Sequence, residues 1–124
     1  MNDRKDLGIQ GENTATAYLQ RKQYYILERN YHSAYGEIDI IARKNDVLVF
    51  VEVKTRSGSL DTGLSSVSRG KQKKIINTAQ IYLSRLSSDT LLETRFDVIS
   101  LTPAGDGTFA IKHLKDAFRP DYSS

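Results

Sequence analysis

Residues 47–56 read VLVFVEVKTR, a stretch apolar enough to form a central β-strand although it carries Glu52 and Lys54. Burying an uncompensated charge in such a strand costs several kcal/mol. Because nothing in the strand itself explains these two groups, the rest of the chain must supply either partners for them or a use for their charges. This strand is therefore the starting point for both the fold and the site.

The pattern on either side of this strand predicts an α/β fold. Apolar residues at helical spacing predict one helix over residues 6–22 and another from residue 66 or 68 to residue 86. The remaining expected elements are strands at 24–31, 36–43, 47–55 and 95–101, a loop at 56–66, an edge strand at 109–113 and a closing helical turn at 114–118. This αβββαβ order is typical of a mixed central sheet flanked by helices.

The length and composition of the chain indicate one domain and one site. A chain of 124 residues suits a single domain, expected over residues 1–124 with an ordered core at about 8–118. The absence of Cys excludes disulfides and thiolate metal sites. Neither a signal-peptide pattern nor an apolar window of membrane length occurs, so a cytoplasmic protein with no membrane partner is expected.

The short turn after the strand GEIDIIAR sets the register of the hairpin that this strand forms with VLVFVEVKT. It places Asp39 opposite Glu52, and Glu37 opposite Lys54. Opposed side chains share a face of the sheet, so all four are expected on one side. The other side is then expected to be core, formed by Ile38, Ile40, Val49, Val51 and Val53.

Two opposed carboxylates have Cβ atoms about 5 Å apart, which is destabilising unless something lies between them. A divalent cation such as Mg²⁺ meets that need, because hard cations prefer oxygen ligands. Lys54 would stand beside the cation and stabilise charge on a phosphate. Glu12, on the first helix, borders the face expected to pack on the sheet and is a further candidate ligand, directly or through water.

These residues occur within a longer pattern. GEIDII followed by VFVEVKTR resembles the PD-ExK nuclease signature, in which an acid on one strand is followed by E-x-K on the next. More narrowly, GENTATAYL, ERN, GEIDIIA, FVEVKTR, the helix from SVSRGKQKKI to YL, and RFDVI resemble in this order the YraN family of predicted endonucleases. That family is similar to the archaeal Holliday-junction resolvases. The likeness covers about residues 8–118.

The resemblance implies a restriction-endonuclease-like core and a role for each motif residue. Asp39 and Glu52 would be metal ligands together with the backbone carbonyl of Val53, and Lys54 would be the catalytic lysine. Ile38 stands where the named motif has Pro, which departs from PD-ExK but agrees with its GEID variant.

The resemblance also extends beyond the strands. Glu12 falls where the resolvases carry a helix glutamate, and Gln72 with Lys71 falls near a helix position that often assists the site. A branched or otherwise structured substrate and a homodimer are implied by the resolvase likeness alone.

The distribution of charge favours a polyanionic partner. The chain has 18 Lys+Arg against 15 Asp+Glu, a net charge of +3 and a sequence pI of about 9.2. Basic residues gather at the start of the second helix. The expected nucleic-acid contacts are Arg56, Arg69, Lys71, Gln72, Lys73 and Lys74.

Simpler interpretations stand beside these. Asp39, Glu52 and Lys54 would also fit a cross-strand ion-pair network. Glu37 has either a supporting role in the site or only an ion pair with Lys54. Glu12 also fits an ordinary acid near a helix start.

The remaining polar and aromatic residues give no clear signal of function. The basic cluster at the start of the second helix is either a phosphate track or a solvated face. His32 and His113 show no ligand spacing and are assigned no role. Tyr24, Tyr25 and Tyr31 are expected to pack in the core or at a strand edge rather than stack on bases.

Together these observations predict a metal-dependent nucleic-acid phosphodiester hydrolase, an endonuclease acting on DNA with Mg²⁺ or Mn²⁺. Water would attack the phosphate in line, with Asp39 and Glu52 holding the cation and Lys54 orienting the nucleophile. The alternative is a nucleic-acid- or protein-binding module that keeps the same fold without cleavage. Dependence on a divalent metal separates the two.

Overall fold

The structure, a computed structural model, describes residues 3–56, 67–87 and 92–121. Its elements are α1 (Asp3–Arg21), β1 (Tyr25–Ser33), β2 (Gly36–Lys44), β3 (Val47–Thr55), α2 (Arg69–Ser84), β4 (Glu93–Pro103) and β5 (Phe109–Phe118). The predicted α/β class and the order of one helix, three strands, a second helix and a further strand are confirmed. Neither helix in the described ranges is both long and apolar enough to cross a membrane.

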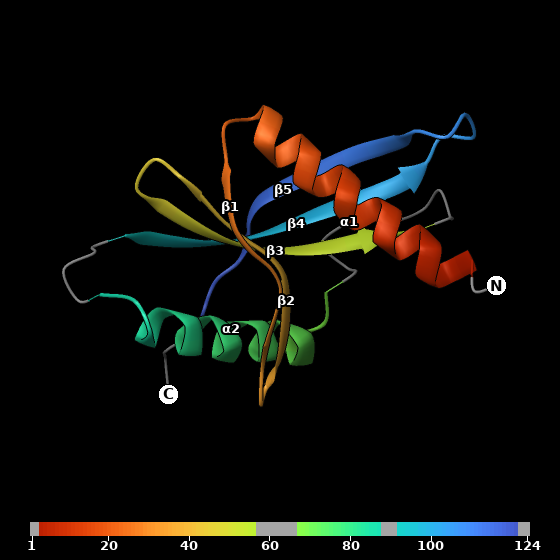
Figure 1. The fold of residues 1–124 in the computed structure, drawn as a ribbon. Coiled ribbons are helices and arrows are strands. Elements are labelled where there is room, and N and C mark those ends of the chain that lie inside the picture. Colours follow the sequence, from red (N-terminus) through yellow and green to blue (C-terminus); the bar gives the residue numbers. More distant parts are fainter. Residues whose placement is uncertain (1–2, 57–66, 88–91, 122–124) are drawn as a thin grey trace.

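The strands form one mixed sheet in the order β1-β2-β3-β4-β5. Every neighbouring pair is antiparallel except β3 and β4, which run parallel and are joined through the crossover that contains α2. Figure 1 shows α1 above the sheet and α2 below it, so each face of the sheet is covered by one helix. This cover explains why β3 reads as an almost continuous apolar run.

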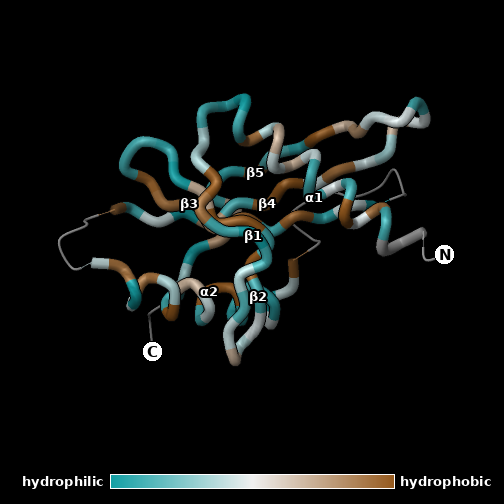
Figure 2. The backbone as a smooth tube through the Cα atoms, viewed as in Figure 1, coloured by the Kyte–Doolittle hydropathy of each residue, from teal (hydrophilic) through white to brown (hydrophobic). Residues whose placement is uncertain are grey.

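Two apolar clusters fill the two faces of the sheet, and Figure 2 shows the hydrophobic backbone positions concentrated along the central strands. The cluster under α1 contains Ala15, Leu19, Tyr24, Ile40, Ala42, Val49, Val51, Ile99 and Leu101. The cluster over α2 contains Ile38, Ile41, Leu48, Phe50, Val67, Ile75, Ala79, Phe96 and Val98. The central strands therefore bury both of their faces.

The prediction of one core face for β2 is wrong at Ile38. Ile38 packs in the cluster beside α2, whereas Ile40 packs in the cluster beside α1. The ladder between β2 and β3 begins only at the pair Ile40–Val51, so the first part of β2 is held by β1 and not by β3. Strand twist then turns that part of β2 toward α2, away from the plane in which Ile40 lies.

The prediction of a helical turn at residues 114–118 is also wrong, because β5 continues as a strand to Phe118. The rings of Phe96 and Phe118 stack with centroids 5.1 Å apart. A register shift near Asp97 inserts extra length into β5, and Asp116 takes up this length with φ 55°. The predicted loop at 56–66 lies, apart from Arg56, outside the described residues.

Candidate active site

The candidate site lies where β2 separates from β3. The predicted register is confirmed along the ladder, which pairs Ile40 with Val51 and continues to the hairpin turn. One residue before the ladder starts, the Asp39 side chain takes the place of a backbone partner. Its Oδ2 accepts a hydrogen bond from the backbone N–H of Val53 at 2.8 Å. We call this separation of the strands, with Asp39 and Glu52 beside it, the acid fork.

Glu52 is almost completely buried in the acid fork, with 6% of its surface exposed. Burial and, next, the neighbouring Asp39 carboxyl raise the pKa of Glu52, Lys71 lowers it, and the net result is a pKa of about 8. Lys71 Nζ lies 3.2 Å from Glu52 Oε2. The ion pair with Lys71 therefore does not fully offset the effect of burial and of the Asp39 carboxyl on Glu52.

Two lysines share the space next to Glu52. Burial lowers the pKa of Lys54, and neighbouring Lys71 and Arg56 lower it too, with Glu52 only partly offsetting them. Burial also lowers the pKa of Lys71, but the Glu52 charge outweighs this and the net shift is upward. Lys71 is therefore the firmly charged partner of Glu52, and Lys54 is an amine from which a proton is more easily removed.

Glu12 approaches the acid fork from α1. Gly11 makes the close approach possible, because a Cβ at this position would overlap Thr55 Oγ1 and lie 3.2 Å from Leu101 Cδ1. Burial raises the pKa of Glu12, Asp39 adds to the rise, and Arg29 lowers it. Glu12 Oε1 is buried without a hydrogen-bond partner, with Arg29 Nη2 3.9 Å away.

The pairing of Glu37 with Lys54 is wrong. Glu37 lies opposite His32 on β1, and the His32 ring nitrogen Nδ1 is 3.3 Å from Glu37 Oε2. The reason is again the early end of the ladder between β2 and β3, which leaves Glu37 beyond the reach of β3. Glu37 still contributes to the acid fork by raising the pKa of Glu12 through its charge.

The predicted nucleic-acid contacts fall into two groups. Lys71 and Gln72 are held by contacts within the protein at the start of α2, and the others are exposed. Ser68 caps the helix by accepting a hydrogen bond from the Lys71 N–H at 3.2 Å, and this positions Lys71 at the acid fork. The side chain of Gln72 donates to the Val67 carbonyl at 3.0 Å and so holds the chain entering the helix. The predicted contacts that lie exposed on the surface are Arg56, Arg69, Lys73 and Lys74.

Sequence reasoning missed a row of residues that runs across the sheet from Lys54. Ser100 on β4 lies beside Lys54, and Lys112 on β5 lies beside Ser100. Paired positions on neighbouring strands project from the same face, so Lys112 is exposed on the face that carries Lys54. In the sequence, Lys112 is only an isolated lysine in an expected strand, and the register of that strand on β4 could not be predicted.

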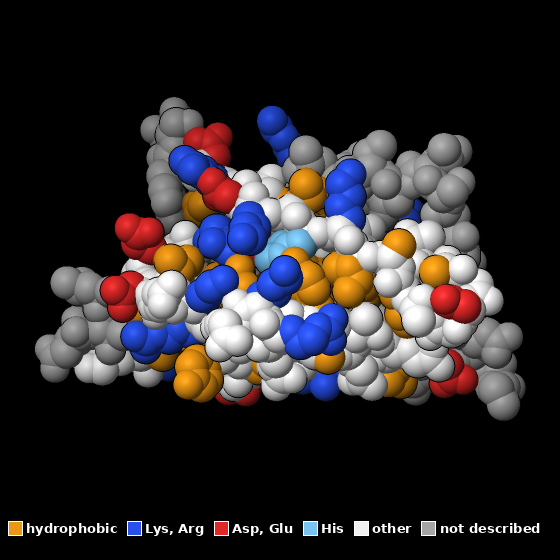
Figure 3. Space-filling model, turned by 90° about the horizontal axis from the view of Figure 1, so that it is seen from above, with side chains coloured by type: hydrophobic (Ala, Val, Ile, Leu, Met, Phe, Trp, Pro, Cys, Tyr) orange, Lys and Arg blue, Asp and Glu red, His pale blue; other side chains and the backbone are white. Residues whose placement is uncertain are grey.

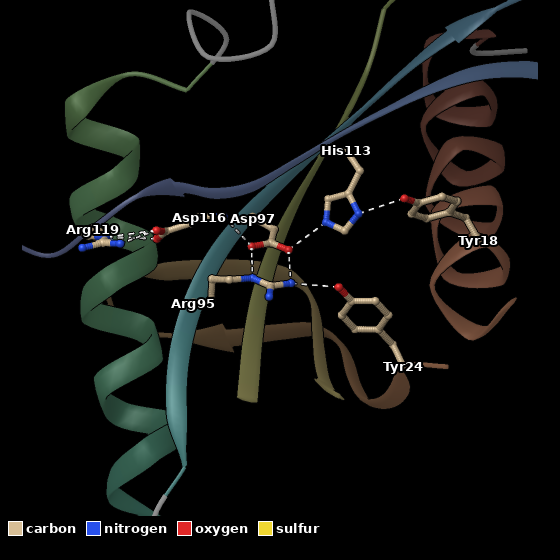
Figure 4. Close-up of polar contacts among 7 residues, drawn as sticks. All are labelled: Tyr18, Tyr24, Arg95, Asp97, His113, Asp116 and Arg119. Atoms are coloured by element: carbon tan, nitrogen blue, oxygen red, sulfur yellow. Dashed lines mark hydrogen bonds and ion pairs between the residues drawn. The ribbon is translucent and has the colours of Figure 1, made fainter. Parts of the chain in front are cut away.

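A second buried carboxylate lies on β4 and forms what we call the Asp97 network, shown in Figure 4. Asp97 receives hydrogen bonds from Arg95 at 2.8 and 2.9 Å and from the Asp116 N–H at 3.0 Å, and its Oδ2 lies 2.7 Å from His113 Nε2. His113 Nδ1 lies 3.0 Å from the Tyr18 hydroxyl. Burial alone would raise the pKa of Asp97, but the bonds from His113 and Arg95 outweigh it and lower the pKa.

The tyrosines considered as base-stacking groups pack differently from one another. Tyr24 is buried and receives a hydrogen bond from Arg95 at 2.8 Å. The Tyr31 ring meets Tyr82 edge-on with centroids 5.2 Å apart. Tyr25 remains exposed on β1. The predicted packing is therefore confirmed for Tyr24 and Tyr31, whereas Tyr25 lies exposed on the edge strand β1.

Positive charge also extends beyond the acid fork. Figure 3 shows Lys and Arg side chains gathered around a histidine at the centre of the face that α1 covers, with acidic side chains toward its edges. Lys22 and Lys44 on this face lie over the rings of Tyr18 and Tyr24, with Nζ 6.0 and 5.0 Å from the ring centroids. Charge alone therefore does not select one face for a polyanion.

The carboxylate oxygens at the acid fork suit a hard cation, although they do not form a complete ligand set. Asp39 and Glu52 offer carboxylate oxygens side by side, and Glu12 Oε1 is buried nearby without a hydrogen bond. Among the described residues, no group of three or more His, Cys, Asp or Glu side chains is placed to hold a metal. Mg²⁺ commonly keeps several waters and uses only one or two protein carboxylates, so this pair fits it.

Comparison with known proteins gives the family. The family described as "Uncharacterised protein family UPF0102" matches residues 11–101. A UPF0102 protein of Chlorobium phaeobacteroides is 46% identical over 122 residues, which cover 93% of this chain and 94% of the relative. A UPF0102 protein of Dictyoglomus turgidum is 44% identical over 118 residues, covering 92% and 98%. The predicted relation to PD-ExK nucleases stays a prediction, and the chain belongs to the UPF0102 family.

Proposed function

We propose that this protein is a metal-dependent nucleic-acid hydrolase, a DNA endonuclease whose active site is the acid fork. The observation that carries the proposal is the buried Glu52 carboxylate beside Asp39, with a pKa of about 8 and the amines of Lys54 and Lys71 close by. A buried acid held in such an unfavourable environment is typical of a functional site. The PD-ExK resemblance supplies the reaction class.

Asp39 and Glu52, with the backbone carbonyl of Val53, would hold Mg²⁺ or Mn²⁺, which supplies polarisation of the phosphate and a more acidic water. Lys54 would orient the attacking water and stabilise charge on the phosphate, a task helped by its lowered pKa. Glu12 would complete the site from the α1 side through its Oε1, which has no hydrogen-bond partner.

Lys71 would have a different task from that of Lys54. In the folded chain it forms an ion pair with Glu52 and so partly neutralises the acid fork. With a divalent cation held by Asp39 and Glu52, the Lys71 ammonium would be available to a phosphate oxygen. Lys71 would thus stabilise the empty site and then contact the substrate.

The substrate backbone would be positioned by exposed cations around the acid fork. These are Arg56, Arg69, Lys73 and Lys74, together with Lys112 at the far end of the row across the sheet. Such contacts make affinity fall with salt and carry no sequence information. A branched substrate and a homodimer rest on the resolvase likeness.

A binding module without catalysis is the second candidate, and one observation favours it. The Glu52–Lys71 ion pair already satisfies part of the acid fork, and no three described acids or histidines are placed to form a larger ligand set. Under this alternative the fork would be a charged structural element. Nucleic acid would then bind without dependence on metal.

The decisive experiment uses labelled linear, flapped and four-way DNA and RNA, each incubated with Mg²⁺, Mn²⁺ or chelator. Wild type is compared with Lys54→Ala and Glu52→Gln, and with Lys115→Ala as a control at an exposed lysine of β5. We expect metal-dependent cutting that falls by about 10²-fold or more in the first two variants, while binding persists. Binding indifferent to metal, with no cutting of any substrate, would establish the module instead.

A further inference from the structure

A shallow polar groove lies between α2 and the turn that joins β1 to β2. It has a volume of about 340 Å³ and is lined by Tyr35, Asn77, Gln80, Ile81 and Ser84. None of these residues belongs to the acid fork or to the predicted nucleic-acid contacts. The lining combines one aromatic ring with side-chain amides.

The turn that carries Tyr35 is fixed against α2. The hydroxyls of Ser33 and Thr78 lie 2.8 Å apart, and Ser33 Oγ also accepts a hydrogen bond from the Tyr35 N–H at 3.0 Å. Gly36 lies so close to the helix that a Cβ there would come within 3.3 Å of Lys74 Cβ. Tyr35 is therefore held beside α2 by Ser33 and Gly36, which lie on either side of it in the turn.

The groups that line the groove are available to a ligand. Tyr35 is 57% exposed, unlike Tyr24, which is buried. Within the described part of the chain, the side-chain amides of Asn77 and Gln80 have no hydrogen-bond partner. An amide offers both a donor and an acceptor, the combination that the edge of a nucleobase requires.

The groove also lies at a suitable distance from the acid fork along α2. Asn77 and Gln80 follow Lys71 by six and nine residues, about 9 and 14 Å along the helix axis. That distance corresponds to about three or four stacked nucleotides. Lys73 and Lys74 lie between the two places and would contact the intervening phosphates.

We propose that this groove binds one unpaired nucleobase of the strand that enters the acid fork. The base would stack on Tyr35, and the amides of Asn77 and Gln80 would hydrogen-bond to its edge. The position of this subsite rests on the proposed function, but base binding itself requires neither metal nor cleavage. The absence of a deep apolar pocket here fits a flat ring that stacks on one side and remains partly in water.

The test measures binding of the full chain in chelator by fluorescence anisotropy. The probes are labelled single-stranded oligonucleotides, intact or with abasic sites, and a fully paired duplex. Tyr35→Ala is compared with Tyr35→Phe and with the control Tyr25→Ala, which removes a 78% exposed tyrosine from β1. We expect Tyr35→Ala to weaken binding of intact single strands by about tenfold, with little effect on abasic strands or duplex, and Tyr35→Phe to bind like wild type.

Equal losses in Tyr35→Ala and Tyr25→Ala, or equal losses on intact and abasic strands, would overturn the subsite. A double variant, Asn77→Ala with Gln80→Ala, gives a second measure, because it should weaken intact strands and spare abasic ones. The two proposals fail separately. A Tyr35 effect without metal-dependent cutting retains the subsite and rejects the hydrolase, whereas cutting that is indifferent to Tyr35 does the reverse.

Discussion

The acid fork and the Asp97 network both bury a carboxylate in a central strand, yet the protein treats the two carboxylates in opposite ways. Asp97 has Arg95, His113 and a backbone N–H around it, and its pKa is lowered. Glu52 has another acid beside it and one lysine at 3.2 Å, and its pKa is raised to about 8. The strands that carry them are parallel neighbours, so the fold could have treated both alike.

This difference in environment suggests a different role for each carboxylate. A buried acid whose bonds are complete within the chain ties elements together, and the Asp97 network joins α1 to β4 and β5 in this way. A buried acid left beside a like charge costs stability unless something from outside compensates it. The first arrangement is structural, whereas the second is the one that we propose as a ligand site.

The largest expected effect is the loss of the Asp97 charge. Asp97→Asn leaves Arg95 without its carboxylate partner, and breaking a buried pair in this way should lower the free energy of unfolding by about 3–5 kcal/mol. Urea unfolding measures it, with Asp46→Asn as the control because the Asp46 side chain is 91% exposed. Since the pKa of Asp97 is lowered below 3.8, the loss should persist through neutral pH and shrink as the pH falls through that lowered value. Similar losses in both variants would remove the distinction between the two carboxylates.

Glu52→Gln should raise the free energy of unfolding, whereas Asp97→Asn should lower it. The pKa of Glu52 rises from 4.5 unfolded to about 8 folded, so its neutral form stabilises the fold below pH 4.5 and this stabilisation is lost as the pH rises toward 8. In chelator at pH 8, the glutamine variant should be more stable than wild type by on the order of 2–3 kcal/mol, with little difference at pH 5. Thermal melts across this pH range measure it.

The effect of added Mg²⁺ on stability is a further test of the difference between Glu52 and Asp97. If the acid fork holds the cation, wild type should gain stability with added Mg²⁺ at pH 8, and Glu52→Gln should gain little. If Glu52→Gln is markedly less stable than wild type in chelator, this would instead favour a simple ion pair between Glu52 and Lys71. The Asp97 variant supplies the contrast, because its loss of stability should not depend on Mg²⁺.

The parts of the fold that follow from short-range patterns could be predicted from the sequence. The turn between β2 and β3 sets their register, and alternation places Glu52 and Lys54 on one face. The end of that ladder could not be predicted, because it depends on how β1 and α2 hold the start of β2. The errors at Ile38 and Glu37 share this cause.

Long-range pairing explains the other errors and omissions. Residues 114–118 have apolar spacing that suits a helical turn as well as a strand, and only the pairing with β4 decides between them. His113 has no ligand-like spacing, since its partners Asp97 and Tyr18 are 16 and 95 residues away. Lys112 likewise becomes a neighbour of the site only through the register of β5 on β4.

A smaller effect tests how far the Asp97 network extends. Tyr18→Phe removes only the hydrogen bond to His113, so it should cost about 1 kcal/mol in the free energy of unfolding and leave the response to Mg²⁺ unchanged. Tyr25→Phe, at an exposed ring, is the matched control. A Tyr18→Phe variant that lost the response to Mg²⁺ would show that the network and the acid fork are coupled rather than separate.

The smallest effect concerns the row that extends from the acid fork. Lys112→Ala should weaken DNA binding about equally for all sequences and reduce the dependence of log affinity on log salt by about one, because it would remove one proposed phosphate contact. Lys115 lies three residues further along the same strand and is also exposed, so Lys115→Ala keeps the change in net charge but removes no member of the row. Equal changes for the two variants would mean that Lys112 acts through net charge alone. A change confined to Lys112→Ala would place the substrate on the face of the sheet that carries Lys54, since Ser100 links the two lysines across neighbouring strands.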